Sequence, residues 1–349
     1  MLFADPRVSV DDRLPGFPHW NQAMRAMAHS RPASVFNRDA DEHSRYRRMM
    51  TKPFTAKRVE ALRPAIQQLA DEHIDAILAG PRPADLISTL ALPVPSLVIG
   101  ALLGVPPEDQ ALFRRHSEVG LLRDATDEQT RQNRIDQMRF MTRLVETKLD
   151  NPGEDAISDM AERVRAGEID IREAAMQGVG LLIAGHETSA NMVGLGTLAL
   201  LENPDQAAVI REATDTRVLA NAVEELLRHL SVVQNGQRRI ALQDIELGDV
   251  TIRAGEGVII DLAPANWDQD IFEHPEQIDV RRVNADRHLA FGFGRHQCVG
   301  QQLARAELQI IFGTLFRRIP TLHLATTIDR IEFKRDRLAY GVYELPVGW

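Results

Sequence analysis

The chain has only one cysteine, Cys298, among its 349 residues. A single cysteine excludes an intrachain disulfide framework, a four-cysteine zinc site and a cysteine-ligated iron–sulfur cluster. An excess of basic residues is missing too, because 41 lysines and arginines stand against 50 aspartates and glutamates, for a formal charge of −9. This acidic balance argues against a nucleic-acid-binding protein. Any sulfur chemistry must therefore rest on Cys298 alone.

Long hydrophobic runs are also missing. The longest, residues 90–105, is interrupted by Pro93, Pro95 and Ser96, and it is shorter than the ~20 residues that a membrane-spanning helix needs. The first residues lack a basic start followed by an apolar core, so no signal peptide is expected. We therefore predict a cytoplasmic protein. Because the sequence shows neither a repeat nor an obvious linker, residues 1–349 are expected to form a single domain.

The hydrophobic pattern predicts a mainly α protein with a minor β part. Apolar residues at helical spacing indicate helices over 58–78, 88–103, 109–122, 126–149, 171–201, 218–230 and 298–318. Short apolar runs next to glycines predict strands over 237–240, 249–253 and 257–262. The helix over 171–201 is apolar almost all round, so it should run through the core.

That central helix carries an unusual group of residues. Gly185 in mid-helix costs about 1 kcal/mol relative to alanine, so it should have a use. Thr188 can donate a hydrogen bond to the carbonyl of Ala184, one turn earlier, and open the helix locally. Glu187 and Thr188 would then form an acid–alcohol pair able to carry protons. The alternative is that Glu187 is a buried acid paired to a base elsewhere.

The stretch from Phe291 to Gly300, FGFGRHQCVG, is the most informative one. Its two glycines before the cysteine allow a tight loop, and Cys298 stands where the loop is expected to become a helix. Free backbone N–H groups and the helix dipole stabilise an anionic sulfur at such a place. A thiolate held in this way is what an axial haem ligand requires. The alternative is an inert buried cysteine.

This loop resembles the haem-binding signature of the cytochrome P450 monooxygenases. Four further stretches resemble the family in the same order along the chain: His43–Arg47, Ala184–Ser189, Glu225–Arg228 and Leu303–Glu307. The last of these and the ending Tyr340–Pro346 look like the soluble bacterial branch that oxidises antibiotics, terpenoids and xenobiotics. The resemblance implies a single-domain cytochrome P450 fold, with a long central helix over the haem and a cysteine-bearing loop beneath it.

The resemblance also implies the site residues. Cys298 would be the axial ligand of the iron of haem b, iron protoporphyrin IX. The expected cofactor-binding residues are His43, Arg47, Ala184, Arg239, Phe291, Gly292, His296, Cys298 and Gly300. Glu187 and Thr188 would be the catalytic pair, while Glu225 and Arg228 would support the loop structurally. Pocket walls are expected from residues 16–36, 112–141, 232–236 and 338–342.

The implied reaction inserts one oxygen atom from O2 into a mid-sized apolar molecule. Electrons would come from NAD(P)H through a ferredoxin reductase and a ferredoxin, which is expected to dock on a basic patch of Arg45, Arg48, Lys52, Lys57, Arg58 and Arg295. Neither nucleic acid nor membrane is an expected partner. Two alternatives stay open: another oxidation, such as epoxidation, dealkylation or ring coupling, and a non-enzymatic haem binder or inactive truncated remnant.

Two departures from the family pattern lead to further expectations. Residues 2–9 resemble a stretch that relatives have several tens of residues into the chain, so the family's first helix and first two strands are expected to be missing. Their loss would expose the edge of a sheet built from 250–253 and 257–262. Gln277 and Trp267 stand where relatives usually have arginine, and the arginine at 277 would join Glu225 and Arg228. We therefore expect a less well compensated Glu225 and weaker haem retention.

Overall fold

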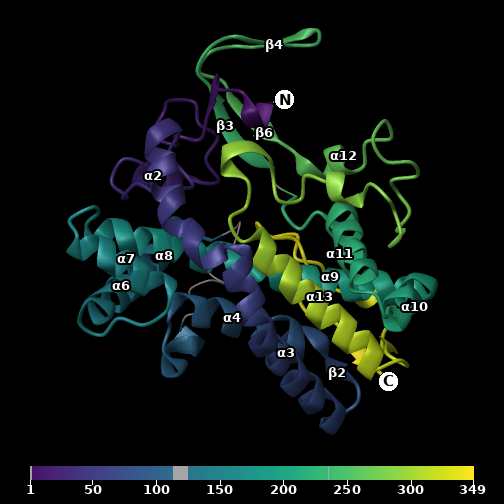
Figure 1. Cartoon of the computed structure of the whole chain (residues 1–349). Coiled ribbons are helices and arrows are strands. Elements are labelled where there is room, and N and C mark those ends of the chain that lie inside the picture. Colours follow the sequence, from purple (N-terminus) through teal and green to yellow (C-terminus); the bar gives the residue numbers. More distant parts are fainter. Residues whose placement is uncertain (1, 113–124, 235) are drawn as a thin grey trace.

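The computed structural model describes residues 2–112, 125–234 and 236–349, and these residues are mainly helical (Figure 1). The helices are α1 (Gln22–Met27), α2 (Ala40–Thr51), α3 (Ala56–Ala79), α4 (Pro93–Leu103), α6 (Asp127–Asp150), α7 (Ala156–Arg165), α8 (Ile171–Gly185), α9 (Glu187–Glu202), α10 (Pro204–Glu212), α11 (Thr216–Leu230), α12 (Leu262–Asn266) and α13 (Gln301–Arg318). A π-helical turn, Ile87–Ala91, precedes α4. The prediction of a mainly α protein with a minor β part is confirmed.

Most of the predicted helices are confirmed to within a few residues, because their apolar faces pack together. The α3 helix lies along α13, and α8 lies along α6, so that their apolar residues form one continuous core. Of the helix predicted over 109–122, residues 113–122 lie outside the described part of the chain. The last helix begins at Gln301, not at Cys298, because Cys298, Val299 and Gly300 still belong to the preceding loop and turn.

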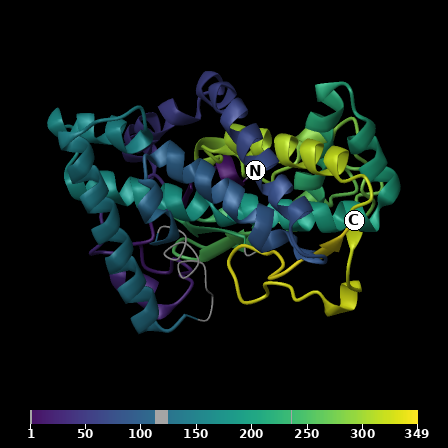
Figure 2. The same cartoon turned by 90° about the horizontal axis from the view of Figure 1, so that it is seen from below.

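The predicted central helix consists of two consecutive helices that are interrupted at His186. The α8 helix starts at a capping box formed by Asp170 and Glu173 and ends at Gly185, and α9 follows after His186. The α9 helix ends before Asn203 and Pro204, as predicted. Figure 2 shows this helix pair running through the middle of the molecule, with other helices on both sides. Its residues are therefore placed to form one wall of an internal site.

The strands form three small antiparallel sheets. Their strands are β1 (Val8–Ser9), β2 (Ala84–Asp85), β3 (Gln237–Ala241), β4 (Ile245–Leu247), β5 (Val250–Ile252), β6 (Gly257–Ile260), β7 (His323–Leu324) and β8 (Pro346–Gly348). The sheet orders are β1-β3-β6, β2-β8-β7 and β4-β5. The expectation of one sheet built from 250–253 and 257–262 is therefore wrong. The β5 strand pairs with β4 in a projecting hairpin, while β6 pairs with β3 (Figure 1).

Within the described ranges, β3 is the only strand paired with β6, and Ile259 on β6 is 54% exposed. The edge exposed in the structure is thus that of β6, in a sheet that also holds the N-terminal strand β1.

As to membranes, no described helix has both the length and the apolar character that a bilayer crossing would need.

Candidate active site

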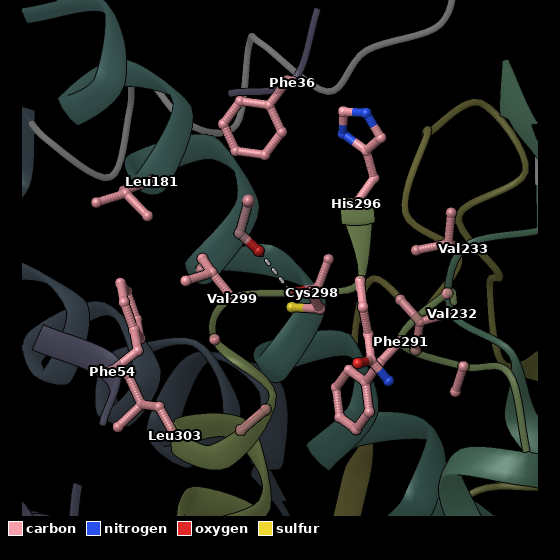
Figure 3. Close-up of a pocket in the computed structure, with 18 of the residues that line it drawn as sticks. Phe36, Phe54, Leu181, Val232, Val233, Phe291, His296, Cys298, Val299 and Leu303 are labelled. Atoms are coloured by element: carbon pink, nitrogen blue, oxygen red, sulfur yellow. Dashed lines mark hydrogen bonds between the residues drawn. The ribbon is translucent and has the colours of Figure 1, made fainter. Parts of the chain in front are cut away.

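A cavity lies between the α8–α9 junction, α2, β3 and the cysteine loop. Of the expected cofactor-binding residues, all nine line it: His43, Arg47, Ala184, Arg239, Phe291, Gly292, His296, Cys298 and Gly300. Thr188 lines it as well. Apolar residues from several elements complete the walls, among them Phe36, Phe54, Leu181, Val232, Val233 and Leu303 (Figure 3). The cavity therefore gathers residues that are up to about 300 positions apart in the sequence, from Phe3 to Leu308.

The cysteine loop holds the sulfur against the cavity. Gly292 and Gly294 adopt φ values of 71° and 78°, in the left-handed region that favours glycine. The amide of Cys298 donates to the carbonyl of Phe291, 2.9 Å away, which closes the loop. The side chain of Cys298 is exposed to the cavity, and the amides of Gly300 and Gln301 donate to its sulfur.

The charge state of this sulfur is set by opposing effects. Burial in the protein raises the pKa of the Cys298 thiol. The amides of Gly300 and Gln301 and the positive charges of Arg47 and Arg305 act in the opposite direction and lower that pKa. These groups would stabilise a thiolate once a metal ion compensates for burial. The site therefore suits a sulfur that binds a metal rather than a free nucleophile.

Four cationic or hydrogen-bonding side chains surround the cavity near the sulfur. The rings of His43 and His296 lie 4.1 Å apart, and the Nε2 atoms of both are buried without a hydrogen-bond partner in the described structure. Burial first, and then the charges of His296 and Arg47, lower the pKa of His43 to about 4. Arg47 donates to the carbonyl of Gln297 at 2.6 Å, and Arg239 on β3 donates to the carbonyl of Arg238 at 2.7 Å.

This cluster has little acidic compensation. Asp39 is near it, with Oδ1 3.7 Å from Nε2 of His296. Buried donors without acceptors are costly, so the cluster is suited to a ligand that brings negative charge. Haem carries two propionate groups of that kind. The donors, the sulfur and the apolar walls therefore fit a haem with the cysteine as its axial ligand.

The α8–α9 junction forms the opposite wall. The hydroxyl of Thr188 donates to the carbonyl of Ala184 at 2.6 Å, which confirms the predicted bond across the junction. Packing explains why a glycine stands at position 185, because a Cβ there would come within 2.9 Å of Cδ1 of Ile99 on α4. Gly185 therefore lets α4 approach the junction closely, and the hydroxyl of Thr188 bonds back onto its own helix.

Glu187 does not line the cavity. Its side chain is 3% exposed, and Oε2 lies 3.7 Å from Nζ of Lys334, which comes from the C-terminal segment. The structure thus shows the arrangement that the sequence left as an alternative, a buried acid paired to a distant base. Nothing in the sequence pointed to Lys334, because its spacing from Glu187 is close to 150 residues and follows no period.

Glu225 and Arg228 are buried and paired, with Nε of Arg228 2.7 Å from Oε2 of Glu225. A second arginine, Arg282, donates from Nε to both carboxylate oxygens of Glu225, at 3.1 and 3.0 Å. Gln277 has an exposed side chain and offers only its backbone carbonyl to the two arginines. The expectation that Glu225 lacks compensation is therefore wrong, because Arg282 supplies the charge that we looked for at position 277.

Trp267 also lies away from the cavity. Its Nε1 donates to the carbonyl of His229 at 3.1 Å, and its ring packs in a tilted arrangement against that histidine, at the end of α11. Trp267 therefore removes no charge from the cavity walls. With Gln277 and Trp267 both outside the site, the physical reason to expect weaker haem retention is lost.

The sequence also missed an acid in the cavity wall. Glu307 on α13 is 2% exposed, lines the cavity, and is hydrogen-bonded to Ser189 on α9. Burial raises the pKa of Glu307 to about 8, against a small lowering by Ser189. In the sequence, the only indication of a role for Glu307 was its position as an acid on the inner face of an apolar helix.

The expected pocket walls are found in part. Val35, Phe36, Val232 and Val233 line the cavity, from two of the four expected segments. From the other two, no described residue lines it, and residues 113–124 of one of them lie outside the described chain.

The expected basic patch is partly neutralised. Lys52 pairs with Asp159, Arg58 with Glu154 at 3.8 Å, and Arg45 with Glu173 at 3.8 Å. For the other three residues, Arg48, Lys57 and Arg295, no ion pair is found within the described structure, and all three are exposed. The free positive charge of this face is therefore about half of what the sequence indicated.

Comparisons with known proteins identify the family. The cytochrome P450 family model matches residues 125–326. Cytochrome P450 CYP105Q4 of Mycobacterium marinum is 64% identical over 348 residues, which cover 100% of this chain and 84% of that protein. The crystal structure of GfsF, a cytochrome P450 of Streptomyces halstedii, is 52% identical with a TM-score of 0.93, and the match covers 100% of this chain and 87% of that one.

A second similar structure is that of the mycinamicin VIII C21 methyl hydroxylase of Micromonospora griseorubida bound to mycinamicin VIII. It is 40% identical with a TM-score of 0.92, covering 100% of this chain and 87% of that one. The chain belongs to the cytochrome P450 family. It is a monooxygenase with a haem-thiolate cofactor.

Proposed function

We propose that this chain, as one domain over residues 1–349, binds haem b through Cys298 and oxidises a mid-sized apolar secondary metabolite with electrons from a ferredoxin. The observation that carries the proposal is the position of Cys298. Its sulfur is open to an apolar cavity, on a loop whose amides donate to it, and four cationic or donor side chains with Asp39 as their nearby acid lie beside it. Each of these features meets one chemical need of a haem.

In this proposal each residue has a defined role. When bound, the haem supplies the activation of O2 and the transfer of one oxygen atom to a carbon atom of the substrate. Cys298 ligates the iron, and His43, Arg47, Arg239 and His296 bind the propionates. Phe291, Gly292, Gly300 and Ala184 bound the cavity on its two faces without polar side chains.

Thr188 and Glu187 are proposed to carry protons toward the cavity. Thr188 is suited to this because its hydroxyl is at the cavity wall and can exchange its bond to the Ala184 carbonyl for one to a water molecule. Glu187 precedes it directly in the chain and is ionisable. Glu225, Arg228 and Arg282 are proposed to hold the 266–288 segment that leads into the cysteine loop.

The substrate class is proposed from the walls and from the relatives. The cavity walls are mainly apolar, which favours a substrate with few charges. One similar structure binds mycinamicin VIII, and a relative 43% identical is named pentalenic acid synthase. We infer that the substrate is a secondary metabolite, of the polyketide or terpenoid class.

The redox partner is proposed to dock on the surface next to the cysteine loop. Arg48, Lys57 and Arg295 are exposed there, and an acidic ferredoxin could bind them although the chain has a net charge of −9. A cytoplasmic location goes with this proposal, because reduced nicotinamide cofactors and ferredoxins are found in that compartment.

The proposal is tested by the carbon monoxide difference spectrum of the reduced protein. We expect the Soret band of a thiolate-ligated haem, and Cys298→Ala should abolish it. Gln297→Ala, one residue earlier in the same loop, is the control and should keep the band. A band of the neutral-thiol type in the wild-type protein, or an unchanged band in Cys298→Ala, would refute the proposal. A spin-state titration with polyketides, including mycinamicin VIII, and terpenoids then tests the substrate class.

A further inference from the structure

A buried lysine from the C-terminal segment faces the acid at the start of α9. Lys334 lies in the segment 332–343, which is closed by the bridge between Phe333 and Val342 and by a 2.8 Å hydrogen bond from the amide of Lys334 to the carbonyl of Gly341. Its side chain is 7% exposed, and its Nζ is 3.7 Å from Oε2 of Glu187. Both members of the ion pair are therefore removed from solvent.

The lysine is fixed by a second contact with the same helix. Its Nζ donates to Oδ1 of Asn191 at 2.9 Å, and Nδ2 of Asn191 donates to the carbonyl of Ala339 at 3.1 Å. Glu187 and Asn191 are one helical turn apart, so the ammonium group contacts two successive turns of α9. A side chain at Gly341 would collide with Asn191, so this glycine makes room for the contact.

Three further titratable groups lie near Glu187 on the elements packed around it: Arg337, Glu307 and His186. Arg337, from the same segment, acts on Glu187 through its charge but also contacts Asp336 and Tyr343. On the side of α13, Glu307 is hydrogen-bonded to Ser189. His186, at the α8–α9 break, directly precedes Glu187 and is fully buried. Among these groups, Lys334 is the cation in direct contact with the carboxylate.

We propose that Lys334 is a positioning residue for proton delivery, which compensates the charge that Glu187 acquires when it releases its proton toward Thr188. This inference rests on the proposed role of Glu187. An unpaired carboxylate in so buried a place would be costly, and the proton would be retained. With Lys334 in place, Glu187 loses one proton toward the cavity and regains one from solvent, while the lysine stays protonated throughout.

The first test measures the Glu187 carboxyl directly in the holoprotein. Its protonated-carboxyl infrared band is identified as the band that Glu187→Gln removes, and it is followed as a function of pH. In Lys334→Met the band should persist to higher pH by about one unit or more, because a neighbouring cation favours the ionised form. Lys334→Arg should restore the wild-type midpoint. Arg335→Met is the matched control, since it removes the same charge at an exposed neighbouring position, and it should leave the midpoint unchanged.

The second test measures oxygen use with a plant-type ferredoxin and its reductase. Hydrogen peroxide released per O2 consumed should rise at least about threefold in Lys334→Met, as expected for slower proton delivery. In the Glu187→Gln background the same substitution should change nothing further. All variants are compared at equal thiolate-ligated haem content. If Lys334→Met fails to retain haem, Lys334→Gln, which keeps a donor for Asn191 without the charge, takes its place.

The outcomes separate this inference from the proposed function. If Glu187→Gln leaves peroxide release unchanged, the proposed role of Glu187 is wrong, and Lys334 has no acid to serve. If Glu187→Gln raises peroxide release but Lys334→Met shifts neither the infrared midpoint nor the peroxide fraction, only the inference about Lys334 is overturned. An additive effect in the double variant would also overturn it.

Discussion

Thr188 shows how one side chain can serve both local structure and chemistry. Its hydroxyl bonds to the Ala184 carbonyl, which accounts for its place at the α8–α9 junction, and it also faces the cavity. A hydroxyl is both donor and acceptor, so it can exchange partners without leaving an atom unsatisfied. This property sets it apart from the apolar residues that surround it.

Thr188→Ala should therefore uncouple oxygen consumption from product formation. We expect the product formed per O2 to fall about tenfold or more, because a positioned proton-transfer group is lost, while haem content stays the same. The measurement is product against O2 consumed with a substrate that gives a spin-state shift. Thr197→Val is the control, because Thr197 is a buried threonine of α9 whose hydroxyl has no hydrogen-bond partner among the described residues. Unchanged coupling in Thr188→Ala would contradict the proposed role.

Glu307 should make the stability of the protein depend on pH. Its folded-state pKa is raised from 4.5 to about 8, so the folded protein retains a proton that the unfolded chain loses. Stability is therefore lost as pH rises from about 4.5 to about 8, by a few kcal/mol at most. Glu307→Gln should raise the melting temperature relative to wild type at pH 8 and much less at pH 5. Equal differences at both pH values would contradict the assignment.

Among the structural elements, a regular helix, α11, is joined by buried charge pairs to the irregular segment 266–288. Glu225 and Arg228 belong to α11, whereas Arg282 belongs to the irregular 266–288 segment. Both arginines donate to the carboxylate of Glu225, and Arg228 also donates to the carbonyls of Asn266, Pro275 and Gln277. The backbone bonds within that segment close local turns, so these side-chain contacts are what tie it to α11 on its way to the cysteine loop.

Arg282→Met should weaken this connection strongly. Removing one partner of a buried charge group costs about 3–5 kcal/mol, since the remaining charge stays buried. We expect a lower melting temperature and a lower ratio of haem to protein. Arg281→Met, the exposed neighbour, is the control and should change neither. If both variants behave alike, Arg282 does not have the role that its contacts indicate.

At the scale of the whole molecule, the site is assembled between layers. The cysteine loop lies on one side of the cavity, the α8–α9 junction on the other, and α2 and β3 supply the cationic side chains between them. The core of packed helices holds these elements at fixed distances. Sheets contribute little to this core, and the edge of β6 and the β4–β5 hairpin are exposed. Exposed strand edges are the surface where association of this protein should be looked for first.

Local sequence patterns were enough to predict most helices, the cysteine loop and the bond between Thr188 and Ala184, although not the break at His186. Each of these depends on local spacing: apolar periodicity for the helices, glycines with positive φ for the loop, and a four-residue step for the threonine. Such features are encoded within a few residues of one another. The family resemblance added the nine cavity residues, which the structure brings together.

Contacts between distant charged groups depend on how the elements pack and could not be predicted from local patterns. Arg282, rather than a residue at 277, completes the pair of Glu225 and Arg228, and Lys334 faces Glu187. Arg282 and Lys334 each stand next to an arginine in a segment rich in charge. No local pattern therefore shows which of the two neighbouring cations is buried. Burial of a charge depends on how separate elements pack, and the free energy of its pairing is set by partners that the sequence places far away.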